Sequence, residues 1–258
     1  MRLMKRILSA VAVLALSASL LVGCSSGTAS SVPVSASSAA ESTVSSVEET
    51  ASSAVDENEA AAAQLLNDLT GSYQELWPVI LADEYKQTWL DVCTALVGED
   101  NAEAAFEKLS SMVTGDVYGE DAVKAYANGG GAYFCGFTNS LAILTFDGET
   151  STISGTDKDG NVLFSHTYHY IGMEPVRGLY EFQSDDADSG EFTYFFLAPD
   201  TSAETYHIEF RYGSDADALS QYDAGDYAYW VASGISTDCD QTMIDNCIEL
   251  FCTENLAG

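Results

Sequence analysis

The chain has 258 residues, with 40 acidic side chains against 9 basic ones and a formal net charge of −31. Nucleic acid is excluded as a natural partner, because a polyanion would be repelled and no Lys/Arg cluster is present to release its counterions. A direct role on an anionic membrane surface is disfavoured for the same reason. Such a surface concentrates cations, but diffusely and without selecting a particular metal.

The first 23 residues have the pattern of an export signal. Three basic residues precede an apolar run over residues 7–22, which is typical of a secretory signal peptide. Residues 21–24, Leu-Val-Gly-Cys, resemble the lipobox of bacterial lipoproteins, in which the cysteine is acylated. The resemblance implies that Cys24 is the lipid attachment point. We therefore expect the protein on the extracytoplasmic face of the bacterial cell membrane, held by a lipid anchor only.

Residues 24–59 form a Ser/Ala-rich segment with one proline and no aromatic residue. Such a segment cannot bury enough apolar surface to offset the entropy of ordering, which predicts a flexible tether. The remaining residues, 60–258, are sufficient for one domain with a sizeable core and short for two.

The first third of this domain has helical periodicity, and β-rich runs follow it. Apolar residues at helical spacing predict helices over residues 59–69, 89–96 and 106–113, and a last amphipathic helix over 241–252. Between them, short runs separated by turn residues predict seven or eight strands. The candidate strands are 132–137, 141–146, 151–154, 162–171, 179–183, 192–198, 205–212 and 227–231. The fold class is therefore mainly β with added helices (α+β), as a small antiparallel barrel or sandwich.

The cysteines and the acidic turns are interpreted as structural features and not as metal-binding or redox sites. After Cys24, five cysteines remain, and none of their spacings is Cys-x-x-Cys. We expect most of them to be small buried apolar residues, with a bridge involving Cys239 as the one candidate disulfide. The acidic stretch 185–191 lacks the donor and glycine spacing of an EF-hand loop and is interpreted as a hairpin tip.

The most informative strand is 205–212. Its alternation places His207 and Glu209 on one face and the apolar residues between them on the other. An imidazole and a carboxylate two residues apart lie ~6.5–7 Å from each other along a strand, close enough to converge on one small cation. His207 and Glu209 are therefore the candidate metal ligands.

No enzyme is predicted from the motifs. The chain has no Gly-x-Ser-x-Gly elbow, no P-loop and no His-Glu-x-x-His, and none of its three histidines lies in a motif that would activate Ser or Cys.

Four segments, in the same order, resemble the ZinT/YodA family of extracytoplasmic zinc-binding proteins. They are residues 68–78, 168–172 with 176–182, 192–199 and 206–215. The last segment, with its Arg-Tyr-Gly end, is similar to the family's "H-F-H-x-R-Y-G-x-D". The resemblance implies a lipocalin-like (calycin) barrel with N-terminal helices and a C-terminal helix, and a zinc site made mainly by three histidines.

Matching the Arg-Tyr-Gly end places His207 and Glu209 on the two histidines of the family's H-x-H, and Phe195 on its third histidine. Matching from Ala198 and Pro199 instead moves the register by two residues, so that Thr205 and His207 take the H-x-H positions. His207 is a ligand position in both registers. The resemblance thus implies one retained histidine, one replaced by a carboxylate and one lost to an apolar ring.

A third ligand is needed, because zinc normally takes at least three protein ligands. The candidates are an acidic side chain such as Glu191 or Glu204, or one of the histidines His166 and His169. For the two histidines, a hydrogen-bonded position in the barrel wall is the favoured interpretation.

The expected function is divalent-metal binding, with zinc as the ion, in metal acquisition or buffering beside a metal ABC transporter. The alternative is a barrel that retains the fold without the metal and binds an apolar ligand or a surface protein. Phe195 at a ligand position favours the alternative, whereas His207 favours the metal.

Overall fold

The computed structural model describes residues 57–114, 133–199 and 207–256, all within the compact unit Ser45–Gly258. The predicted signal peptide, Cys24 and nearly all of the predicted tether lie outside the described residues. Residues 57–59, at the end of the predicted tether, begin a helix that continues to residue 68.

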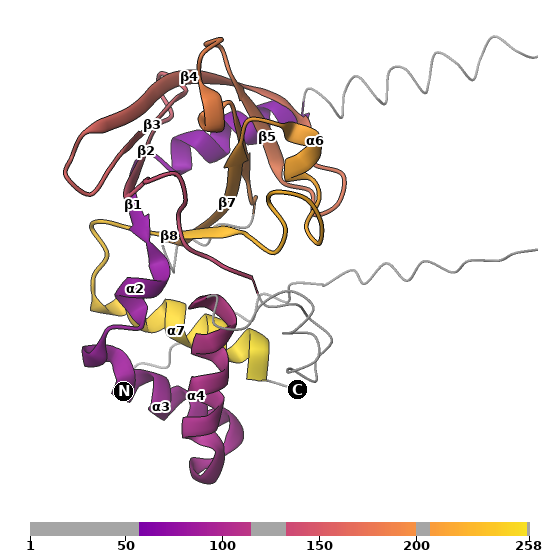
Figure 1. Cartoon of the computed structure of the whole chain (residues 1–258). Coiled ribbons are helices and arrows are strands. Elements are labelled where there is room, and N and C mark those ends of the chain that lie inside the picture. Colours follow the sequence, from indigo (N-terminus) through magenta and orange to yellow (C-terminus); the bar gives the residue numbers. More distant parts are fainter. Residues whose placement is uncertain (1–56, 115–132, 200–206, 257–258) are drawn as a thin grey trace, which may run out of the picture. The chain divides into compact units, whose positions relative to one another are not determined.

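Eight antiparallel strands close into a barrel in which neighbours in sequence are neighbours in the sheet (Figure 1). The strands are β1 (Gly71–Glu75), β2 (Ile143–Asp147), β3 (Thr152–Thr156), β4 (Val162–Met173), β5 (Tyr180–Ser184), β6 (Tyr194–Leu197), β7 (His207–Gly213) and β8 (Ala232–Ser236). The first and last strands pair and complete the closure. This up-and-down topology is that of lipocalins and confirms the predicted fold class.

Six of the predicted strands correspond to β2 through β7, and two others are wrong. The segment predicted at 227–231 precedes β8 instead of forming it, and at 132–137 the structure has only a bridge between Phe134 and Trp230. The acidic stretch 185–191 connects β5 to β6, as expected for a hairpin tip.

The interior of the barrel is filled by aromatic rings. Register places Tyr170, Phe182, Phe195 and Tyr212 in one row across four strands, β4 to β7. Phe182, Phe195 and Tyr212 are at most 1% exposed. Because stacked rings occupy this space, the inside of the barrel is a packed core and not a ligand cavity.

The helix over residues 57–68 packs against one end of the barrel. Its buried residues Ala62, Leu65 and Leu66 belong to the same apolar core as the barrel interior. The helix and the barrel approach closely at Gly148. A Cβ atom added to this glycine would lie 2.4 Å from the Cα atom of Asn67. A glycine at this turn is therefore required by the packing.

The remaining main helices build a second core on the outside of the barrel. They are α2 (Leu76–Ile80), α3 (Lys86–Val97), α4 (Glu99–Thr114) and α7 (Gln241–Leu256), drawn below the barrel in Figure 1. Trp89 of α3 is fully buried and donates from Nε1 to the carbonyl of Ile80 at 2.7 Å. Ile235 of β8 belongs to this second core, so the outer face of β8 is covered by the helices.

None of the helices in the three described ranges combines the length and apolar character needed to span a bilayer.

Candidate metal centre

His207 and Glu209 lie on the outer face of β7. Their cross-strand neighbours on β8 are Ile235 and Ser233, and Ile235 packs into the helical core outside the barrel. The residue between them, Ile208, is 1% exposed and belongs to the barrel interior. The prediction that His207 and Glu209 share a face is therefore confirmed, and that face is directed toward the helices.

A small pocket joins this face of β7 to the helices. It has a volume of about 40 Å³ and is lined by Leu76, Trp77, Ile80, His207, Glu209, Cys247, Leu250, Phe251 and Glu254. Four of these side chains are zinc ligands by type: His207, Glu209, Glu254 and Cys247. Cys247 is buried in the helical core, and burial raises the pKa of its thiol to about 12, which disfavours the thiolate that zinc requires. A space of this size admits an ion with water and excludes an organic molecule.

The negative charge of Glu209 affects the pKa of a neighbouring thiol. Burial raises the pKa of Cys135 to about 12, and the negative charge of Glu209 contributes to this rise. The backbone carbonyl of Cys135 accepts from the amide of Ser233, the residue opposite Glu209. Glu209 is thus an exposed carboxylate whose negative charge acts on a buried thiol of the helical core.

Phe195, the third position in the family resemblance, lies on the other side of the wall. Its partner across β6 and β7 is Tyr212, whose ring faces the interior, and Phe195 is fully buried there. The structure therefore does not bring Phe195 together with His207 and Glu209.

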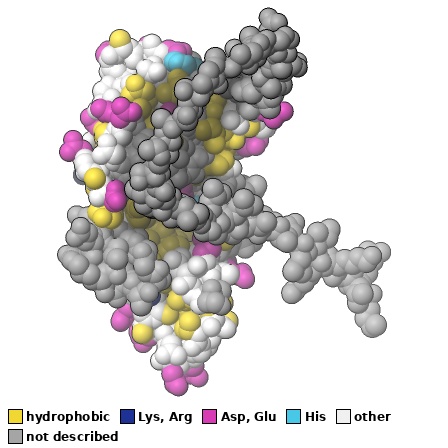
Figure 2. All heavy atoms as spheres, turned by 90° about the vertical axis from the view of Figure 1, so that its right-hand side faces the viewer, with side chains coloured by type: hydrophobic (Ala, Val, Ile, Leu, Met, Phe, Trp, Pro, Cys, Tyr) yellow, Lys and Arg dark blue, Asp and Glu magenta, His cyan; other side chains and the backbone are white. Residues whose placement is uncertain are grey.

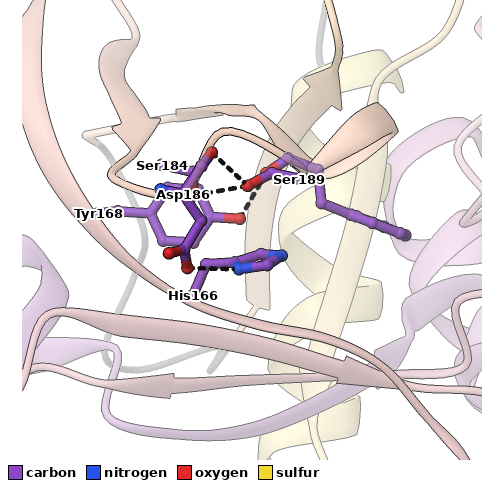
Figure 3. A network of polar contacts seen from close by, with 6 residues as sticks. His166, Tyr168, Ser184, Asp186 and Ser189 are labelled. Carbon is purple, nitrogen blue, oxygen red and sulfur yellow. Dashed lines mark hydrogen bonds and ion pairs between the residues drawn. The ribbon is translucent and has the colours of Figure 1, made fainter.

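The two other histidines each contact an aspartate. Nδ1 of His166 lies 2.7 Å from Asp186, and Nδ1 of His169 lies 2.6 Å from Asp185. Figure 3 shows the first pair beside Ser184 and Ser189, whose hydroxyls hydrogen-bond each other and the backbone of Asp186. The interpretation of these histidines as hydrogen-bonded residues of the wall is confirmed.

Of the two candidate acidic ligands, the structure describes Glu191 and places it elsewhere. Glu191 accepts hydrogen bonds from Ser214 and Tyr227, at 3.1 and 3.0 Å, at the edge of a different pocket. Glu204 lies outside the described residues. Within residues 57–114, 133–199 and 207–256, no group of three or more His, Cys, Asp or Glu side chains is gathered closely enough to hold a metal ion.

Glu254 is the functional candidate that sequence reasoning missed. It lies near the end of α7, 45 residues after Glu209 by residue number, and reaches the pocket only because α7 folds back against the barrel. No local pattern connects the two carboxylates.

Arg211 fixes the strand that carries the pair. It lies on the outer face two residues beyond Glu209, is 0% exposed, and donates to the carbonyls of Leu219 and Tyr227. Its guanidinium stacks 4.3 Å from the centre of the Tyr222 ring. Burial lowers its pKa from the usual value, and the neighbouring Tyr222 opposes this shift.

A larger, open pocket lies away from the metal candidates. It has a volume of about 610 Å³, and its lining combines aromatic rings with two carboxylates. The lining residues are Phe134, Thr138, Asn139, Glu191, Ser214, Asp226, Tyr227, Ala228, Tyr229 and Trp230.

In Figure 2 the Asp and Glu side chains are scattered over the visible face instead of gathering in one patch.

The fold places the protein in the architectural class of closed, up-and-down, eight-stranded barrels with accessory helices. No protein-family model and no curated protein sequence matches the chain. Among solved structures, it is similar to the Zn(II)-bound ZinT-like domain of Streptococcus pneumoniae AdcA, with 14% identity, a TM-score of 0.45, and coverage of 71% of this chain and 89% of that one. Zn(II)-bound AdcA itself matches with 14% identity and a TM-score of 0.43, over 72% of this chain and only 35% of AdcA.

The first of these structures is named after the family that the sequence motifs resemble. The similarity is too distant to assign the chain to that family, and the bound zinc is a property of those proteins.

Proposed function

We propose that the protein is a lipid-anchored, extracytoplasmic domain that binds a divalent metal ion, zinc by ligand chemistry, between β7 and α7. His207 and Glu209 are the first two ligands and Glu254 is the third. The observation that carries the proposal is that these three side chains, from two elements, line one pocket.

The ligand set suits zinc better than calcium or magnesium. Imidazole nitrogen with carboxylate oxygen is a common zinc environment, and three protein ligands leave a fourth position for water. Calcium and magnesium prefer oxygen ligands throughout.

The surroundings of the pocket favour a cation. The chain is strongly acidic, and Glu254 lies in the last turn of α7, where the carbonyl ends of the helix carry partial negative charge. Binding requires Glu254, an exposed side chain, to change rotamer toward the other two ligands.

Calorimetric titration of the full chain with zinc tests this proposal. We expect micromolar or tighter binding, weakened about 10-fold or more by each of His207→Ala, Glu209→Gln and Glu254→Gln. His169→Gln and Glu149→Gln are matched controls, because they remove a histidine and a glutamate outside the pocket. Absence of binding by the unmodified chain, or equal affinities in all variants, would rule the site out.

The alternative function, a metal-free binding module, is favoured by the open pocket of about 610 Å³. Because the barrel interior is filled, an apolar ligand would bind at this pocket and not inside the barrel. Fluorescence of the neutral probe N-phenyl-1-naphthylamine tests it: Ala228→Trp, which fills the pocket, should abolish the enhancement seen with the unmodified chain. An enhancement that persists in this variant would exclude the pocket as the binding site.

A further inference from the structure

Two buried thiols from different helices lie in contact at the centre of the helical core. Cys93 of α3 and Cys252 of α7 are each 0% exposed, and their sulfur atoms are 4.0 Å apart. The residues around them, Trp89 and Ile248 among them, belong to the same apolar core.

The geometry needs little change to form a bond between them. A disulfide has an S–S distance of about 2.05 Å, so the sulfurs must approach by roughly 2 Å. Small side-chain rotations supply such a movement where the two helices are already packed together, as α3 and α7 are.

We propose that Cys93 and Cys252 form a disulfide that joins α3 to α7 in the mature protein. The proposal uses the oxidising compartment to which the predicted export signal directs the chain. It is independent of the metal proposal, because neither cysteine lines the pocket of His207.

The chemistry is a thiol–disulfide exchange. One thiolate attacks an external disulfide, and the second thiolate then displaces the external thiol from the mixed disulfide. The two cysteines lose two electrons and two protons, and the external disulfide is reduced to two thiols. Since burial raises the pKa of both thiols, the bond forms while α7 is docking and not after the core has closed.

The bond would constrain a long loop. The two cysteines are 159 positions apart, and the link encloses the strands from β2 to β8, whereas β1 precedes it in the chain. Restricting the unfolded chain over such a loop stabilises the folded state. Cys135, Cys239 and Cys247 would remain as single thiols.

Peptide mapping tests the inference directly. The full chain is reduced and unfolded, then refolded in mild detergent with EDTA and glutathione disulfide. It is afterwards denatured, alkylated with N-ethylmaleimide and digested with Glu-C. We expect the peptide that contains Cys93 to be joined to the peptide that contains Cys252. Alkylation of both cysteines, a mixed disulfide with glutathione at either one, or a bridge through Cys239 would overturn the proposal.

A thermal measurement with matched variants gives a second test. Dithiothreitol should lower the Tm of the oxidised chain by about 5–15 °C, and equally that of Cys247→Ala, a buried cysteine on the same helix. It should leave the Tm of Cys93→Ala and Cys252→Ala unchanged. An equal fall in Tm for all four proteins on adding dithiothreitol would contradict the assignment. If a variant fails to fold, the peptide map of the unmodified chain still tests whether Cys93 and Cys252 are bonded.

Discussion

Phe195 lies directly opposite Tyr212 in the β6–β7 pair, with 5.4 Å between their ring centres. Tyr212 faces the interior of the barrel, whereas His207, at the opposite parity of the same strand, faces outward. The position where the family resemblance expects a third histidine is thus separated from the other two positions by the barrel wall.

Phe195→His should therefore fail to complete the proposed site. We expect unchanged zinc affinity and a loss of about 2–4 kcal/mol in the free energy of unfolding, because an imidazole replaces a fully buried ring that stacks on its neighbours. Urea denaturation and zinc titration measure the two effects. Tighter zinc binding that disappears when His207→Ala is added would show that the wall does not separate these residues.

Replacing the histidines that contact aspartates should leave metal binding intact. His166→Gln and His169→Gln are each expected to change the zinc affinity by less than about 2-fold, because neither lines the pocket. The pair of His169 and Asp185 is about half exposed, so its loss should cost less than about 1 kcal/mol. A large loss of zinc affinity in either variant would show that the metal site lies at β4 instead.

Arg211→Met should destabilise the fold strongly. The side chain is fully buried, and its removal leaves the carbonyls of Leu219 and Tyr227 without their donor, at an expected cost of about 3–5 kcal/mol by urea denaturation. Arg177→Met is the matched control, because Arg177 stacks 4.2 Å from the centre of the same Tyr222 ring but is exposed. Equal costs for the two substitutions would mean that the buried carbonyl contacts contribute little.

The carboxyl group of Glu181 should make stability depend on pH. Burial, followed by the charges of Glu174 and Asp217, raises its pKa above the ordinary value of 4.5. The folded protein therefore holds this proton more firmly than the unfolded chain, and stability falls as pH rises through the raised value.

Glu181→Gln removes this penalty. We expect a gain below about 1 kcal/mol at pH 7 and little change below pH ~4, where the group is protonated in both states. The Tm measured from pH 3.5 to 7 checks the trend, with the exposed Glu149→Gln as control. A gain of the same size at every pH would point to packing instead of charge.

The strands that the sequence predicted well are those with one solvent-exposed face. In β4, Phe164 and Tyr168 are buried and His166 is partly buried, while Ser165 and Thr167 are exposed, so the alternation is visible along the chain. In β8, four consecutive residues from Ala232 to Ile235 are buried, because the barrel covers one face and the helices cover the other. A strand of small residues buried on both faces shows no alternation, which is why it was missed.

The site was predictable only within one strand. The period of two residues places His207 and Glu209 on the same face, but it does not say whether that face is inside or outside the barrel. The side follows from closure of the barrel around Ile208, Phe210 and Tyr212, and the arrival of Glu254 follows from the packing of α7. Both depend on contacts between segments distant in sequence, which local patterns do not encode.

Closure of the barrel also has a consequence for neighbouring copies. In the part of the chain that the structure describes, every strand of the sheet has a partner on each side, since β1 pairs with β8. Copies held side by side by the proposed lipid anchor would reach high local concentration, yet they would find no open edge onto which another copy could add a strand. Crowding at the membrane should therefore not promote intermolecular β-sheet growth by the folded domain.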